Sequence, residues 1–183
     1  MIMKNNDRKF KRIFIILSVL LIANVVIITY SWSAIGIRME KESLANEADL
    51  IVVGTVKDKY TEDIKEEGFY TFITFSVDEY IKGYPVNEVV IKQFGGTIGN
   101  KAIGIPGMPG FSIGERVLVF LKYFDDDGYY RVVEAAQGKF SIVKDPDSGR
   151  ETLKRDLSGL HFINWQHIDS KIYFDDYLKS LRK

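Results

Sequence analysis

Residues 95–110 form the part of this sequence best suited to contact a ligand. They read GGTIGNKAIGIPGMPG, with six glycines and two prolines in sixteen residues, so we predict a long, shaped loop that continues no strand. Glycines let a ligand or partner approach the backbone closely, and loops of this length usually serve a function. The candidate binding residues are Gly95, Gly96, Gly99, Asn100, Lys101, Met108 and Phe111.

A structural interpretation of residues 95–110 is also open. The glycines would then make the turns that close a small β-barrel, with Ile98, Ile103 and Ile105 packed against it. A phosphate-binding loop is excluded, because neither GxxxxGK[ST] nor GxGxxG occurs in the segment.

Catalytic and metal-binding motifs are missing from the sequence. It has no cysteine, which excludes disulfides, thiolate nucleophiles and cysteine-ligated metals. The two histidines, His161 and His167, form no H-E-x-x-H motif, and no G-x-S-x-G elbow is present. We therefore expect no catalytic residue, no metal and no cofactor.

The acidic residues also lack a chemical pattern. Asp125, Asp126 and Asp127 precede Gly128, but an EF-hand needs a glutamate at its twelfth position, where Ala136 stands. This run is typical of a solvated hairpin turn. Adjacent carboxylates elsewhere in the chain diverge on a strand, so no paired acid and base is indicated.

The elements that would carry a site are mostly strands. Apolar and β-branched runs separated by turn residues predict a five-stranded, OB-like barrel with an added hairpin. Helical spacing of Phe174, Tyr177, Leu178 and Leu181 predicts a C-terminal helix packed on the barrel. The expected barrel strands are 49–56, 69–81, 88–94, 115–123 and 129–133, and the added hairpin is 139–144 with 151–154. We expect a bulge or bend at Gly54 in the first strand.

An apolar segment at residues 13–30 predicts attachment to a membrane. It carries no charge, and its eighteen residues would make roughly 27 Å of helix, close to the thickness of a bilayer core. Basic residues precede it, so the body should lie outside the cytoplasm as a single-pass protein. The alternative is a signal peptide cleaved near Ser33, which would release the body.

These features divide the chain into four parts. We expect a basic tip with a transmembrane or signal segment at 1–34, a linker at 35–47, the barrel at 48–144, and a hairpin return with the C-terminal helix at 145–183. Five of the 25 basic residues but only one of the 25 acidic residues lie in 1–33, so the body has four excess negative charges. A mildly acidic body of this kind argues against binding to nucleic acid.

The order of motifs resembles a group of uncharacterised exported prokaryotic proteins. The resemblance rests on ADLIVVGTV, VDEYIKG, EVVIKQFGG, DDDGYYRVV and AAQGKF, and above all on PGMPGFSIGERVLVFL at 106–121. It covers about half of the chain and implies export and an all-β domain, without an activity.

A more distant similarity is to netrin-like domains and tissue inhibitors of metalloproteinases, which are OB-fold barrels. It rests on Ala48-Asp49 with Val52 and Val56, on Lys82-Gly83, and on Gly114-Glu115 before Val117-Leu118. Those inhibitors bind zinc through an N-terminal cysteine, which this chain lacks, so only the fold is implied.

The sequence therefore predicts a membrane-tethered or exported, non-catalytic binding module. Its partners would be the membrane, through residues 13–30, and an unknown protein or envelope ligand. The alternative function is a protease-inhibitor-like regulator or an unrecognised hydrolase.

Overall fold

The computed structural model describes residues 14–18, 34–163 and 171–182, and the chain divides into two units, Met1–Ser33 and Ala34–Lys183. In the first unit only a short helical stretch at 14–18 is described. Most of the predicted membrane segment, 13–30, lies outside the described residues. Within the described ranges, no helix has both the length and the apolar character needed to cross a membrane.

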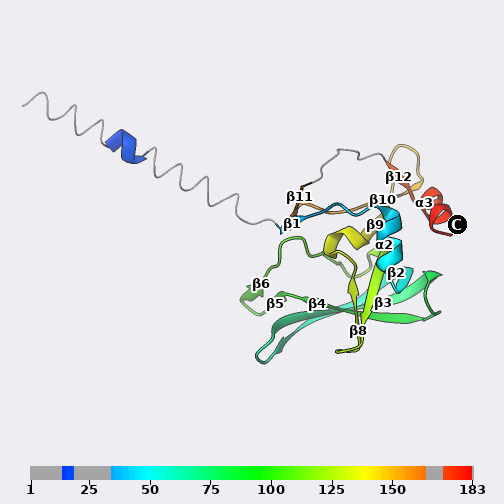
Figure 1. Cartoon of the computed structure of the whole chain (residues 1–183), viewed down its shortest axis with the longest axis horizontal. Coiled ribbons are helices and arrows are strands. Elements are labelled where there is room, and N and C mark those ends of the chain that lie inside the picture. The colour runs from blue at the N-terminus through cyan, green and yellow to red at the C-terminus, as the bar shows by residue number, and fades with distance from the viewer. Residues whose placement is uncertain (1–13, 19–33, 164–170, 183) are drawn as a thin grey trace, which may run out of the picture. The chain divides into compact units, whose positions relative to one another are not determined.

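The second unit is mostly β, with a C-terminal helix, as the sequence predicts (Figure 1). Its helical elements are α2 (Lys41–Glu47), η1 (Ala135–Gly138) and α3 (Phe174–Leu181). Its strands are β1 (Ala34–Gly36), β2 (Leu50–Ile64), β3 (Gly68–Lys82), β4 (Glu88–Phe94), β5 (Gly96–Ile98), β6 (Lys101–Ile103), β7 (Arg116–Phe124), β8 (Tyr129–Val132), β9 (Lys139–Lys144), β10 (Glu151–Lys154), β11 (Leu160–Phe162) and β12 (Ile172–Tyr173).

Five of these strands pair in a closed cycle. β2 pairs with β3, β3 with β4, and β7 with both β2 and β8, all antiparallel. β8 completes the cycle by pairing in parallel with β4, at Ile91 and Tyr130. β9, β10 and β12 extend the sheet outward from β7. A cycle has an inner and an outer face, and this division organises the rest of the molecule.

The hairpin between β2 and β3 is longer than expected. We expected residues 61–68 to be its connection, but both strands are 15 residues long and the turn is reduced to 65–67. Cross-strand contacts hold the extension together: Tyr60 stacks on Phe72 at 5.2 Å, and the Thr61 and Thr71 hydroxyls lie 3.0 Å apart. Near the other end, the register shifts at Gly54, where a bulge or bend was predicted.

The glycine-rich segment is also more regular than expected. The prediction that it continues no strand is wrong at its first half, where β5 and β6 form a small antiparallel hairpin with its turn at Gly99 and Asn100. Gly99 has a φ of 58°, a left-handed conformation that glycine adopts without strain, and this allows the tight turn.

Two hydrophobic cores lie on opposite faces of β2 and β7. On β2, Leu50 and Val52 point into the cycle, while Ile51 and Val53 point outward, and both pairs are almost completely buried. β7 alternates in the same way. Strands buried on both faces need a second layer, and here the outer layer consists of α2, α3, β9 and β10.

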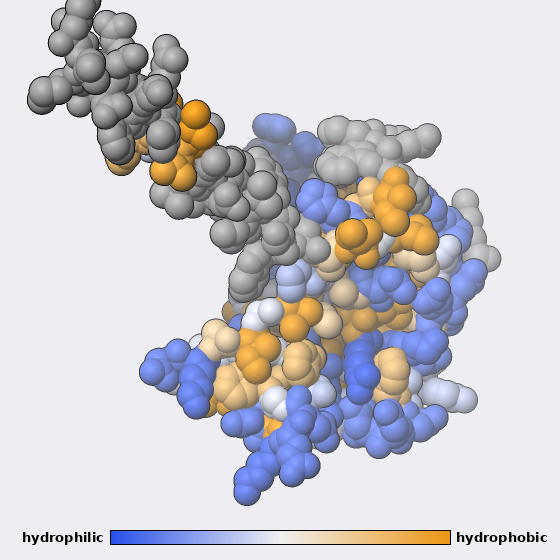
Figure 2. All heavy atoms as spheres, turned by 60° about the vertical axis from the view of Figure 1, so that its left-hand side comes forward, coloured by the Kyte–Doolittle hydropathy of each residue, from blue (hydrophilic) through white to orange (hydrophobic). Residues whose placement is uncertain are grey.

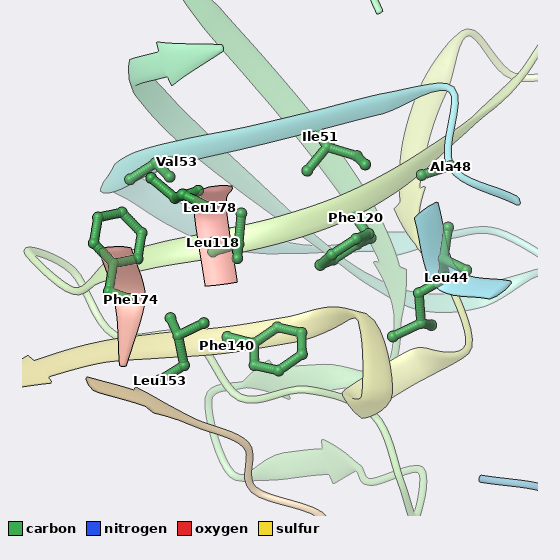
Figure 3. Close-up of a cluster of buried hydrophobic side chains, with 11 residues drawn as sticks. Leu44, Ala48, Ile51, Val53, Leu118, Phe120, Phe140, Leu153, Phe174 and Leu178 are labelled. Carbon is green, nitrogen blue, oxygen red and sulfur yellow. The ribbon is translucent and has the colours of Figure 1, made fainter. Parts of the chain in front are cut away.

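Figure 3 shows the outer core. Leu44 from α2 and Phe174 and Leu178 from α3 point toward Leu118 and Phe120 on β7. The burial of Phe174 and Leu178 confirms the predicted apolar face of the C-terminal helix. The outer faces of the first half of β2 and the first half of β7 are therefore covered.

Candidate functional site

The outer face of β4, β8 and the last residues of β7 is not part of either core, and it carries three cationic side chains. Lys122 on β7 is directly paired with Arg131 on β8. Because Ile91 pairs with Tyr130, the next residues, Lys92 and Arg131, are neighbours across β4 and β8. Lys92, Arg131 and Lys122 therefore form a row across three adjacent strands, which we call the cation row.

One carboxylate partly neutralises this row. Asp127 Oδ2, in the turn before β8, lies 3.1 Å from Lys92 Nζ and 2.7 Å from Arg131 Nη2. Burial acts to raise the pKa of Asp127, but hydrogen bonds from Arg131 and Lys92 outweigh it, so its pKa lies below the ordinary value. Lys122 is exposed and forms no ion pair with the described residues, so the row keeps a surplus of positive charge.

Aromatic rings surround the cation row. Lys92 Nζ lies 4.5 Å from the ring centroid of Tyr70, and the Arg131 guanidinium lies 4.2 Å from that of Phe124. Lys92 is only 8% exposed, and a lysine this buried is stabilised by such partners. The face thus combines fixed positive charge with apolar surface.

A cavity of about 370 Å³ opens over this face. It is lined by the three cations, by Tyr70, Phe94 and Phe124, and by Met108 and Pro109 of the glycine-rich segment. We call it the Lys92 pocket. Two carboxylates, Glu47 at the end of α2 and Glu134 after β8, also line it. Glu134 lies three residues after Arg131 in the sequence.

Gln93 supplies a polar atom that the fold leaves unpaired. Its Nε2 donates a hydrogen bond to the carbonyl oxygen of Pro109 at 3.2 Å. Its Oε1 is buried and has no hydrogen-bond partner among the described residues. A buried acceptor of this kind costs free energy unless a donor reaches it. Gln93 lines both the Lys92 pocket and a second cavity of about 450 Å³.

The structure separates the binding residues suggested by the sequence. Met108 lines the Lys92 pocket, whereas Gly96 and Phe111 line the second cavity. Gly99, Asn100 and Lys101 are exposed at the tip of the β5–β6 hairpin, and Gly95 is buried, with its amide donating to the carbonyl of Phe69. The segment therefore contributes to two cavities and a hairpin and does not form one compact site.

Close packing accounts for two of its glycines. A Cβ atom on Gly96 would lie 2.4 Å from Thr71 Oγ1, and one on Gly107 would lie 2.4 Å from Leu160 Cδ2. Both residues also have positive φ angles. At these two positions only glycine fits without strain.

Sequence reasoning missed the cation row. Lys92 lies on β4, far in the chain from Lys122 on β7 and Arg131 on β8, and none of the three belongs to a catalytic or ligand-binding motif. Two signals were present. Lys92 directly follows the apolar run Val89-Val90-Ile91 of β4. The predicted turn at 125–128 is confirmed, with Asp125 and Asp126 exposed, but Asp127 at its end contacts two cations.

In the described part of the chain, the nearest approach to a catalytic arrangement is a cluster of Glu115, Lys139 and Ser141. Lys139 Nζ lies 3.0 Å from Ser141 Oγ, but both groups also contact the Glu115 carboxylate. Among the described residues, no three histidine, aspartate or glutamate side chains lie close enough to hold a metal ion. His161 is exposed, and His167 lies outside the described residues.

Comparison with known proteins does not assign a function to this site. No protein-family model and no curated protein matches the sequence.

Proposed function

We propose that residues 34–183 form a non-catalytic binding module, held outside the cytoplasm by residues 13–30 or released after cleavage near Ser33. Its ligand would bind in the Lys92 pocket. The observation that carries this proposal is the cation row, because three cations, only two of which share a carboxylate, create a site for negative charge.

We further propose that the five-strand cycle is an OB-like barrel. Its strand order and its single parallel link, between β4 and β8, support this reading. Barrels of this class bind ligands on the face of their second and third strands. Those strands are here β3 and β4, which contribute Tyr70 and Lys92 to the pocket. Fold analogy alone assigns no ligand, so the ligand class comes from the side chains.

The side chains favour a ligand with one anionic group and an apolar or aromatic part. The anion would lie at Arg131 and Lys122, and the apolar part against Phe124 and Met108. Glu47 and Glu134, which also line the pocket, would repel a second negative charge on the ligand. A hydroxyl or amide donor on the ligand would satisfy Gln93 Oε1.

A matched pair of probes tests this class. 1-Naphthyl phosphate and 1-naphthyl glucoside share an aromatic ring but differ in charge, and thermal unfolding of a chain beginning at Ala34 is measured with each. We expect the phosphate, and not the glucoside, to raise the melting temperature progressively, with the logarithm of its concentration once that exceeds Kd, because it binds only the folded state. Equal shifts would show that charge is not recognised, and no shift with either probe would contradict the proposed site.

Processing is tested separately by the intact mass of the protein from membrane and released fractions. A mass that includes residues 1–33 in the membrane fraction supports the single-pass anchor. A mass beginning at Ala34 supports release.

The alternative functions, a protease-inhibitor-like regulator and an unrecognised hydrolase, have no observation that favours them. The Glu115–Lys139–Ser141 cluster is the nearest approach to catalytic chemistry, and its charges are already paired.

A further inference from the structure

A small parallel ribbon follows directly after residues 1–33. β1 pairs with β11, with Ala34 opposite Leu160, Ile35 opposite His161 and Gly36 opposite Phe162, and the two labels lie side by side in Figure 1. Neighbours in register project to the same face of a parallel pair, and successive residues alternate. The Ile163 amide donates to the carbonyl of Gly36, which continues the register by one step.

The two faces of this ribbon differ sharply in exposure. Leu160 packs over Gly107 and is half-buried with the rest of its face. The opposite face carries Ile35, Ile37 and Ile163, which are 76%, 63% and 77% exposed, together with exposed His161. Figure 2 shows hydrophobic side chains gathered at more than one place on a face that also carries many hydrophilic ones. We call Ile35, Ile37 and Ile163 the ribbon patch.

The position of the patch in the chain indicates what covers it. Ile35 is five residues after Tyr30, the end of the apolar segment. An extended chain spans at most about 3.5 Å per residue, so Ile35 lies within roughly 18 Å of the point where that segment ends. If residues 13–30 span the bilayer, the patch is confined to the layer just outside it.

We propose that the ribbon patch inserts into the headgroup region of the outer membrane surface and orients the body there. This inference rests on the anchor in the proposed function. Shallow burial of a few large aliphatic side chains is how peripheral elements bind a bilayer interface. The body's four excess negative charges give no attraction to anionic lipid, so the contact depends on these isoleucines.

A second protein is a poorer occupant for this patch. A stable protein–protein interface buries about 800 Å² on each partner, and three isoleucine side chains on a two-stranded ribbon offer far less. A bilayer surface needs no shape complementarity and no minimum area, and the anchor keeps it adjacent at all times.

The absence of cysteine allows a direct test. Single-cysteine variants Ile37→Cys, Ile163→Cys and, as a control, Tyr84→Cys are made in the full chain and labelled with an environment-sensitive fluorophore. Tyr84 is 87% exposed and lies outside the ribbon. Each protein is reconstituted in vesicles of phosphatidylethanolamine and phosphatidylglycerol, and the label is quenched either by aqueous iodide or by a nitroxide attached to the lipid.

We expect iodide quenching at Ile37→Cys and Ile163→Cys to be several-fold weaker than at Tyr84→Cys, and nitroxide quenching to be several-fold stronger. Flotation of the same vesicles reports the anchor independently. If the chain floats but both ribbon labels behave like the control, the inference is overturned and the anchor stands. If the chain does not float, the anchor is wrong and the inference falls with it.

Discussion

The outer surface of the five-strand cycle has two halves that follow opposite rules. Over the first halves of β2 and β7, outward side chains such as Ile51 and Phe120 are apolar and are covered by α2, α3 and the β9–β10 hairpin. Over β4, β8 and the end of β7, outward side chains are Lys92, Arg131 and Lys122, and a cavity lies above them.

β7 passes from one half to the other. Leu118, Phe120, Lys122 and Phe124 all project to its outer face, but the first two are fully buried and Lys122 is exposed. The change occurs within one alternating strand, so backbone geometry does not cause it. The added elements stop at this point, and the residues beyond it are available for recognition. The difference suggests that the covered half supplies stability and the open half supplies binding.

The largest expected effect is in the covered half. Phe120 is fully buried and its ring centroid lies 5.8 Å from that of Phe140, so Phe120→Ala should lower the free energy of unfolding by about 3–5 kcal/mol. Chemical denaturation measures this. Tyr84→Ala, at an exposed position, is the control and should change stability by less than about 0.5 kcal/mol. Similar values for the two variants would contradict the outer core.

The second effect compares two ion-paired lysines. Lys92 is buried in the open half, and its loss leaves part of the Asp127 charge without a partner. Lys92→Met should therefore lower the free energy of unfolding by about 2–3 kcal/mol. This loss is at or below the low end for breaking a buried ion pair, because Arg131 still contacts Asp127. Lys57→Met removes an exposed pair with Glu88 and should cost less than about 0.5 kcal/mol. Equal denaturation midpoints for Lys92→Met and Lys57→Met would contradict a stabilising role for the buried Lys92 ion pair.

The third effect concerns the glycine-rich segment. Gly96→Ala must accommodate a Cβ against Thr61 and Thr71 at a positive φ angle, and should cost about 1–2 kcal/mol. Gly99→Ala has open space and only the left-handed φ to accommodate, so its cost should be about 1 kcal/mol, the low end for that conformation. Thermal unfolding of both variants tests this order, and the reverse order would show that packing does not explain Gly96.

The smallest effect on stability depends on pH. Asp145 is buried in the turn before β10, where hydrogen bonds from Lys171 and then from Ser148 lower its pKa to about 2. Its folded-state pKa is below the unfolded value, so its stabilising contribution is present above about pH 4 and is lost as the pH falls toward 2. Asp145→Asn should thus be less stable than the wild type at pH 6, and this difference should shrink between pH 4 and pH 2. A difference that does not change with pH would contradict the ion pair.

The sequence allowed most of the fold to be predicted, because alternation and turn residues act locally. The ranges of β4, β9, β10 and the C-terminal helix follow directly from such patterns. The extension of β2 and β3 through charged residues could not be predicted from local patterns, because it depends on cross-strand pairs such as Tyr60 with Phe72. The cation row could not be predicted either, because the pairing of β4 with β8 that makes Lys92 and Arg131 neighbours is a long-range contact.

Binding of 1-naphthyl phosphate to two lysine variants tests the central claim, that the Lys92 pocket and not the hairpin tip is the binding site. Lys122 and Lys101 are both exposed, but only Lys122 lines the pocket. Isothermal titration should show affinity about threefold weaker for Lys122→Gln than for the wild type, the size expected for one exposed charge contact. Lys101→Gln should bind like the wild type. Weaker binding by Lys101→Gln with no change in Lys122→Gln would place the site at the hairpin tip and contradict the account.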